Sequence, residues 1–162
     1  DISGDPVDIA LAAQLEVRRR REAALHERRD HSFETVVSHP SHIDHLVLAR
    51  DAGFDVIVYF VATEDPFINL GRVRNRVLHG GHNVPRERIA ARYHRSLGNL
   101  PAALAVAHEG AVFDNSSAAA PMRQIATISA GVLNLMVDEA ATPQWWRECL
   151  PRVRDALQGS DL

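Results

Sequence analysis

The sequence predicts one α/β domain, residues 1–162, in which a mainly parallel sheet is flanked by helices. Three observations lead to this prediction. Segments with helical periodicity alternate along the chain with short β-branched runs. Residues 55–62 (DVIVYFVA) are almost continuously apolar, as in a strand buried on both faces of a parallel sheet. A length of 162 residues is also typical of about one domain.

The first part of the chain is predicted to contain two helices and two strands. An amphipathic helix covers residues 6–29, and the β-branched run 32–38 (SFETVVS) predicts a strand. A proline followed by the capping pattern S-H-I-D opens a second helix over residues 40–53. The apolar strand 55–62 comes next.

The remaining elements follow from prolines that open helices and from apolar runs between them. We expect helices at 66–79, 85–97 and 101–108, a strand at 111–114, one or two weaker strands within 123–137, and a last helix from Pro143.

Composition and charge exclude several classes of protein. The net charge of −3 and the pI near 6.3 argue against nonspecific binding to nucleic acid or to an anionic membrane. No apolar run approaches the roughly 18 residues that span a bilayer. The single cysteine, Cys149, excludes an internal disulfide and is expected to be a buried packing residue. We therefore expect a soluble, cytoplasmic protein.

Polar residues leave each predicted strand at the edge of the sheet where chemistry gathers in α/β proteins. The predicted strands end in Glu34, Thr35 and Ser38, in Thr63, Glu64 and Asp65, and in Asp114, Asn115 and Ser116. Glu34 interrupts an apolar strand, where an ionised carboxylate needs a partner. It is a candidate for ligand binding, and a place on a half-exposed edge is the alternative.

Arginines form a second group, on either side of the pair Gly80-Gly81. Arg72 and Arg76 are four residues apart on one helical face, and Arg88, Arg92 and Arg95 share a face of the next helix. Two basic faces joined by glycines are able to close over a polyanion, as phosphoryl transfer requires. The alternative is a solvated hairpin whose arginines pair with Glu87.

Histidines offer a weaker possibility. His39, His42 and His45 are spaced by three residues, and neutral imidazoles at helical spacing are able to bind zinc. A proline separates the first histidine from the helix, so a solvated helix start is favoured and no metal site is predicted.

Four motifs together resemble the zeta-toxin family. They are F-E-T-V-V-S-H-P-S, R-x-R-x-R-V-x-x-G-G-H-x-V-P, R-I-x-x-R-Y-x-R-S and V-F-D-N-S, which lie within residues 33–116. The closest likeness is to the chromosomal, actinobacterial-type members. The resemblance implies a P-loop kinase that phosphorylates UDP-N-acetylglucosamine with ATP and Mg²⁺ and is restrained by a small helical antitoxin protein.

The resemblance also implies roles for individual residues. Glu34 would bind substrate at the sugar end, with Thr35 beside it and Ser38 nearby. Arg76, or Arg72, would clamp phosphate from a helical lid over about residues 66–98. His82 stands where a second clamping arginine is expected, and Arg92 or Arg95 would serve instead. The nucleotide would contact Asp114, Asn115 and Ser116, and Val36 replaces a threonine of the family pattern.

The family's P-loop, G-x-x-x-x-G-K-[ST], is not found in these residues. All 18 basic residues are arginine, so the phosphate-binding lysine has to come from outside this sequence. We expect a kinase fold without its N-terminal strand and P-loop, which leaves an apolar sheet edge and an inactive chain. Two alternatives remain: a P-loop kinase for another nucleotide or small molecule, and a non-catalytic remnant that binds a nucleotide or a partner protein.

Overall fold

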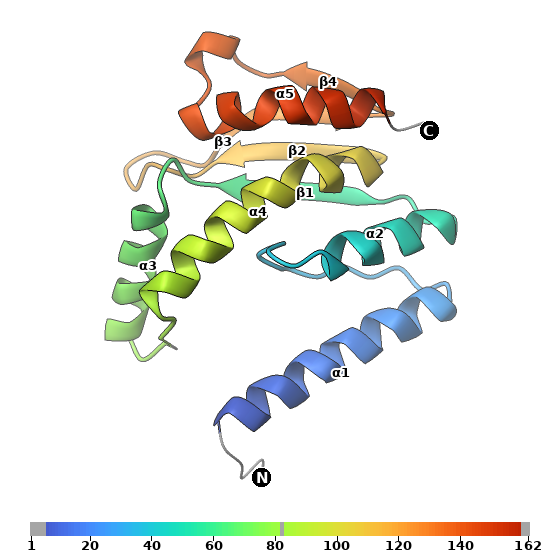
Figure 1. Ribbon diagram of the computed structural model, residues 1–162, viewed down its shortest axis with the longest axis vertical. Coiled ribbons are helices and arrows are strands. Elements are labelled where there is room, and N and C mark those ends of the chain that lie inside the picture. The colour runs from blue at the N-terminus through green and yellow to red at the C-terminus, as the bar shows by residue number, and fades with distance from the viewer. Residues whose placement is uncertain (1–5, 82, 160–162) are drawn as a thin grey trace. The chain divides into compact units, whose positions relative to one another are not determined.

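The computed structural model describes residues 6–81 and 83–159 (Figure 1). Its contacts divide the chain into two compact units, which meet between Glu34 and Thr35 and are described separately.

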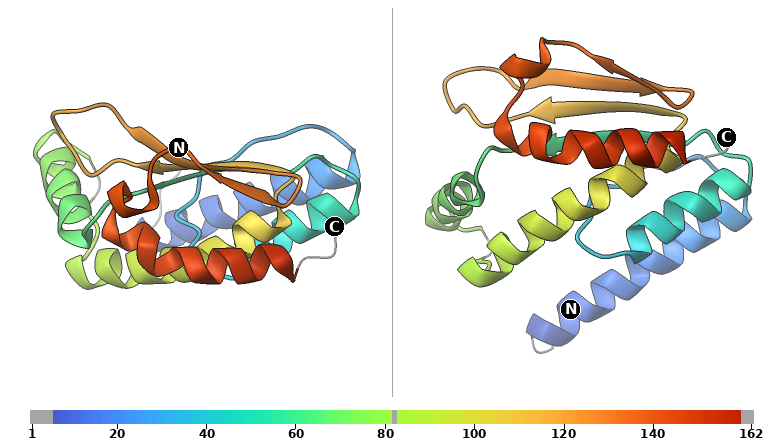
Figure 2. Two further views of the ribbon diagram at one scale, coloured as in Figure 1. Left: turned by 90° about the horizontal axis from the view of Figure 1, so that it is seen from above. Right: turned by 45° about the horizontal axis from the view of Figure 1, so that its top comes forward.

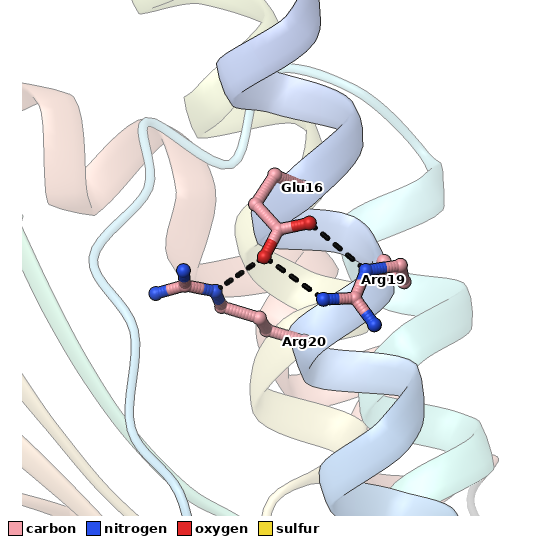
Figure 3. A network of polar contacts seen from close by, with 3 residues as sticks. All are labelled: Glu16, Arg19 and Arg20. Carbon is pink, nitrogen blue, oxygen red and sulfur yellow. Dashed lines mark hydrogen bonds and ion pairs between the residues drawn. The ribbon is translucent and has the colours of Figure 1, made fainter.

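The first unit is built on helix α1, Pro6–His26. Arg18, Arg19 and Arg20 pair with carboxylates one helical turn away, because residues three or four positions apart are neighbours on a helix surface. Figure 3 shows Glu16 accepting hydrogen bonds from Arg19 (2.9 and 3.0 Å) and from Arg20 (2.7 Å). These contacts, first of all the bond from Arg19, lower the pKa of Glu16 to about 2. An irregular segment follows, and the centre of its Phe33 ring lies 4.6 Å from the guanidinium of Arg21 in α1.

The second unit contains a four-stranded sheet in the order β1-β2-β3-β4. The strands are β1 Ile57–Ala62, β2 Glu109–Asp114, β3 Arg123–Ser129 and β4 Val132–Leu135. Only β1 and β2 are parallel, so the sheet is mixed, and the expectation of a mainly parallel sheet holds for one strand pair alone. The reason lies in the connections. Ala130 and Gly131 both have positive φ, the geometry of a tight turn that joins antiparallel strands.

Helices cover one face of this sheet. They are α2 Ser41–Asp51, α3 Pro66–Leu78, α4 Arg86–Val106 and α5 Gln144–Gln158, with a short 3₁₀ turn, η1, at Glu139–Ala141. Figure 2 shows α4 and α5 lying on the same side of the strands. Helices α2 and α3 pack in turn against α4.

The core lies between the sheet and these two helices. Trp146 from α5 and Leu100 and Leu104 from α4 are fully buried against Val112 and Ile128 of the sheet. A β-bulge adds Ile125 to this core. The register between β2 and β3 shifts after Val112, so that Ile125 is an extra residue of β3, and it is fully buried.

The other face of β1 carries exposed apolar side chains. Ile57, Tyr59 and Val61 are 56%, 71% and 48% exposed, whereas Phe60 and Ala62, which point to the opposite face, are buried. The prediction that this apolar run is buried on both faces is therefore wrong for the described residues. Strand β1 is also an edge strand of the described sheet, as is β4.

Helix α4 corrects a second prediction. We expected separate helices at 85–97 and 101–108, but α4 is continuous and contains Pro101. A proline cannot donate to the carbonyl four residues before it, here that of Leu97. The buried Cys149 thiol lies 3.9 Å from this oxygen and donates to it, so the helix continues across the proline.

The predicted strand at 32–38 is not formed. In the second unit, Val37 has φ of 51°, a left-handed conformation that is rare for a β-branched residue. Helix α4 takes the place of a strand partner: Asn99 Nδ2 donates to the Val37 carbonyl (2.8 Å) and Arg95 Nε to that of Ser38 (3.1 Å). The backbone is thus satisfied by side chains rather than by a sheet.

The other predicted helices and strands are confirmed with shifted ends. Helix α3 begins where Pro66 predicted it, and the Asp65 carboxylate caps it by accepting from Phe67 N (2.7 Å). Among the described residues, no helix is both long enough and apolar enough to cross a membrane.

Candidate functional site

The candidate site lies at the carboxyl ends of β1 and β2. Because these strands are parallel, Ala62 and Asp114 end side by side, and Asn115 N donates to the Ala62 carbonyl (2.8 Å). The segments after the strands then meet: Glu64 N donates to Ser116 Oγ at 2.8 Å. The structure thus brings together two of the three predicted strand-end groups.

The polar side chains of this region hold one another in place. Asp114 accepts from the Ser116 hydroxyl (2.5 Å) and from Trp145 Nε1 (3.2 Å). The Glu64 carboxylate accepts from Gln144 N (3.0 Å), the first residue of α5, where the helix dipole favours an anion. These bonds fix the loop after β2, and the half-buried Asn115 lies in the same loop.

The hairpin of α3 and α4 is the basic part of the molecule. Residues 66–98, here called the basic hairpin, carry seven arginines and a single carboxylate, Glu87. Their net charge is +6 in a chain whose total charge is −3. The ion pairs found among residues 6–81 and 83–159 do not include one between Glu87 and these arginines.

Two arginines of the predicted phosphate clamp make hydrogen bonds to the main chain. Arg72 Nη2 donates to the Asn115 carbonyl (2.7 Å) and lies 3.4 Å from its Oδ1. Arg95 donates to the Ser38 carbonyl. Arg92 is half-buried on α4, and Arg76 is exposed on α3. His82 lies outside the described residues.

The pair Gly80-Gly81 ends helix α3 and seats Arg76. Gly80 has φ of 83° and donates to the Val77 carbonyl, while Gly81 N donates to the Arg76 carbonyl (3.0 Å). A Cβ atom on Gly81 would lie 2.5 Å from Cγ of Arg76 and 2.9 Å from its carbonyl oxygen. Only glycine leaves room here for the stem of the arginine.

The predicted substrate residues lie before α2. Glu34 is exposed and lies in the irregular segment of the first unit. Thr35 is exposed and Ser38 half-buried at the start of the second unit, and Thr35 Oγ1 accepts from Val37 N at 3.3 Å. The bonds from Asn99 and Arg95 tie Val37 and Ser38 of the second unit to α4, beside the C-terminal half of the basic hairpin.

A pocket of about 300 Å³ lies between the first turns of α3 and α4. Its lining is mostly apolar, and the Arg86 guanidinium lies 5.1 Å from the centre of the Phe67 ring at this place. The pocket is lined by Pro66, Phe67, Leu70, Arg86, Glu87, Ile89 and Ala90. The site residues predicted from the sequence lie outside this lining.

Sequence reasoning missed Tyr93, Trp145 and Gln144. The Tyr93 hydroxyl donates to the carbonyls of Thr63 (2.8 Å) and Glu64 (3.2 Å). Burial, and after it the charges of Glu64 and Asp65, raise the pKa of Tyr93 to about 12. The place of Tyr93 between two arginines of R-I-x-x-R-Y-x-R-S could have indicated a role for it. For Gln144 and Trp145, the sequence of α5 contains no motif that predicts contact with the strand ends.

In the described part of the chain, no three histidine, cysteine or carboxylate side chains are grouped so that they could hold a metal ion. The first of the three histidines near α2 instead bonds to Ser41, with His39 Nδ1 2.8 Å from its hydroxyl.

Comparisons of the chain with models of protein families, with curated proteins and with solved structures gave no match.

Proposed function

We propose that this chain belongs to an ATP-dependent small-molecule kinase of the zeta-toxin type, which phosphorylates a nucleotide sugar similar to UDP-N-acetylglucosamine. The observation that carries the proposal is the basic hairpin, with its net charge of +6, held at the carboxyl ends of two parallel strands. Ligands of α/β proteins bind at this edge of the sheet, and a polyanionic ligand suits the charge.

The arginines of the basic hairpin would neutralise charge on the transferred phosphoryl group. In phosphoryl transfer, catalysis consists mainly of positioning and of electrostatic stabilisation by fixed donors. Arg76 is the best candidate for the clamp, because Gly81 seats its stem and because it lies one turn beyond the anchored Arg72. Arg92, on the facing helix, would add a second positive charge.

The proposed fold is that of a P-loop kinase, completed by a further segment of the protein. Mg²⁺ would bridge the ATP phosphates and offset their charge. A lysine of the P-loop is needed as well, and these 162 residues contain none. The exposed apolar face of β1 and its position at the sheet edge support this proposal, because an added strand and helix would cover Ile57, Tyr59 and Val61.

The remaining candidates would bind the two substrates. Glu34, Thr35 and Ser38 would contact the sugar acceptor, and the loop of Asp114, Asn115 and Ser116 would contact the nucleotide. In that loop, Asp114 and Ser116 bond to each other and would shape the loop, which leaves Asn115 as the residue for direct contact.

A kinase for a different nucleotide or small molecule is the second candidate. The observation that favours it is Val36, which is exposed where the family pattern has a threonine near the sugar. A panel of acceptors separates the two candidates.

The test is ATP consumption by the protein made from the full coding sequence that contains this chain. Arg76→Ala should lower kcat/KM by about 100-fold or more, the usual effect of removing a fixed donor to transition-state charge. Arg74→Ala is the matched control: it removes the same charge from α3, but two residues away and on a different side of the helix. Equal activity of the wild-type protein and Arg76→Ala would contradict the proposed clamp.

A further inference from the structure

The turn between β1 and α3 is a junction for four parts of the second unit. Thr63, Glu64 and Asp65 form this turn, and Asp65 caps α3. Ser116 from the loop after β2 and Gln144 from α5 both bond to Glu64. Tyr93 completes the junction from α4. The turn therefore determines where the basic hairpin begins relative to the sheet.

Tyr93 is the anchor of α4. Its hydroxyl donates over 2.8 Å to the Thr63 carbonyl, and the Glu64 carbonyl lies 3.2 Å away. Thr63 is buried, and a buried carbonyl that loses its donor destabilises the structure around it. The pKa of about 12 at Tyr93 keeps the phenol protonated, so that it donates at any physiological pH.

Arg72 is the corresponding anchor of α3. Its Nη2 atom donates over 2.7 Å to the carbonyl of Asn115. This acceptor lies next to the Tyr93 acceptor, since Asn115 N in turn bonds to the Ala62 carbonyl just before Thr63. The two helices of the basic hairpin are thus attached to adjacent main-chain carbonyls at the ends of β1 and β2.

The attachment of Arg72 also directs Arg76. Residues four positions apart lie on the same face of a helix. Because the Arg72 side chain reaches the loop after β2, Arg76 stands on the same face of α3, one turn farther from the sheet.

We propose that Tyr93 and Arg72 are positioning residues, which fix the two helices of the basic hairpin to the ends of β1 and β2 so that Arg76 meets the phosphate. The proposal deepens, and rests on, the proposed kinase function. It assigns Arg72 to holding the hairpin, and it leaves the phosphate contact to arginines farther along the hairpin.

The first experiment measures amide hydrogen exchange in the 162-residue chain and needs no activity. Tyr93→Phe and Arg72→Met each remove one donor but keep most of the side-chain volume. Both should speed exchange in α3 and in the first half of α4, while β2 and β3 keep their protection. Tyr59→Phe is the matched control, because it removes a hydroxyl from an exposed tyrosine, and it should leave exchange in the hairpin unchanged.

The second experiment uses the full-length protein and compares lysine substitutions. Arg72→Lys keeps one donor for the Asn115 carbonyl, so it should recover most of the kcat/KM that Arg72→Met loses, which we expect to be about tenfold or more. Arg76→Lys should not recover activity in the same way, because lysine lacks the planar fork that binds phosphate oxygens. Such a difference separates a positioning arginine from one that contacts phosphate.

The two proposals fail differently. Unchanged hairpin exchange in Tyr93→Phe and Arg72→Met would overturn the positioning role and leave the kinase function standing. Faster exchange throughout β2 and β3 would overturn it too, because the two residues would then be general stabilisers. Faster exchange in the hairpin alone, with no kinase activity in the full-length protein, would support the anchors and contradict the function.

Discussion

At the scale of single residues, several side chains hold the fold together by hydrogen bonds to distant parts of the main chain. Cys149, Tyr93 and Arg72 each donate to a main-chain carbonyl far away in the sequence. The sequence allowed us to predict that Cys149 is buried, and this is confirmed. The bond partners were not predictable, because a carbonyl carries no sequence signal and long-range contacts depend on the completed fold.

The carboxylate of Glu16 should titrate at low pH. Its bonds to Arg19 and Arg20 lower its pKa from 4.5 to about 2, so their stabilising effect on α1 is present above pH 4.5 and is lost as the pH falls toward 2. NMR titration of the Glu16 side chain should give a midpoint near pH 2. The helix content of Glu16→Gln should be lower than that of the wild-type chain at neutral pH, and the two should not differ at low pH. A midpoint near 4.5 would contradict the network in Figure 3.

The loss of the Cys149 thiol should destabilise the second unit. Cys149→Ala leaves the partly buried Leu97 carbonyl without this donor, at a cost of about 1 kcal/mol in the free energy of unfolding. Cys149→Ser keeps a donor and should recover part of this loss. Urea denaturation measures both variants. If Cys149→Ala is as stable as the wild-type chain, the thiol does not support α4 at Pro101.

At the scale of elements, local sequence patterns predicted where most helices lie. The exceptions are segments whose structure depends on the elements that they contact in the fold. Pro66 and Asp65 predicted the start of α3, and the structure confirms it. Pro101 predicted a break that packing against α5 prevents. The run at 32–38 has strand-forming residues, but in the described chain side chains from α4 bond to its backbone instead.

The end of α3 gives a prediction about Arg76. Gly81→Ala places a Cβ atom against the Arg76 stem, so the arginine has to move. The free energy of unfolding should fall by about 1–3 kcal/mol. Activity of the full-length protein should fall as it does in Arg76→Ala. Gly71→Ala is the matched control on the same helix: it meets open space and should stabilise α3 by about 0.5–1 kcal/mol. Equal effects of the two alanines would contradict the seating of Arg76 by Gly81.

At the scale of the whole molecule, the α/β class was predictable from alternating periodicity, but the strand directions were not. Antiparallel β3 and β4 follow from a tight turn at Ala130 and Gly131, and only the second of these is a residue type that signals such a turn. The apolar pattern of β1 also predicted burial on both faces, whereas one face is exposed. That face fits the proposal that a further strand and helix complete the sheet.

The central claim is that the basic hairpin closes on the phosphates of ATP in a small-molecule kinase. The most direct measurement is phosphoryl transfer from ATP to UDP-N-acetylglucosamine by the protein made from the full coding sequence, with the product identified by mass. The account predicts turnover, and a loss of about 100-fold or more in Arg76→Ala. No ATP consumption, with this acceptor or with a panel of nucleotides and other small-molecule acceptors, would contradict it.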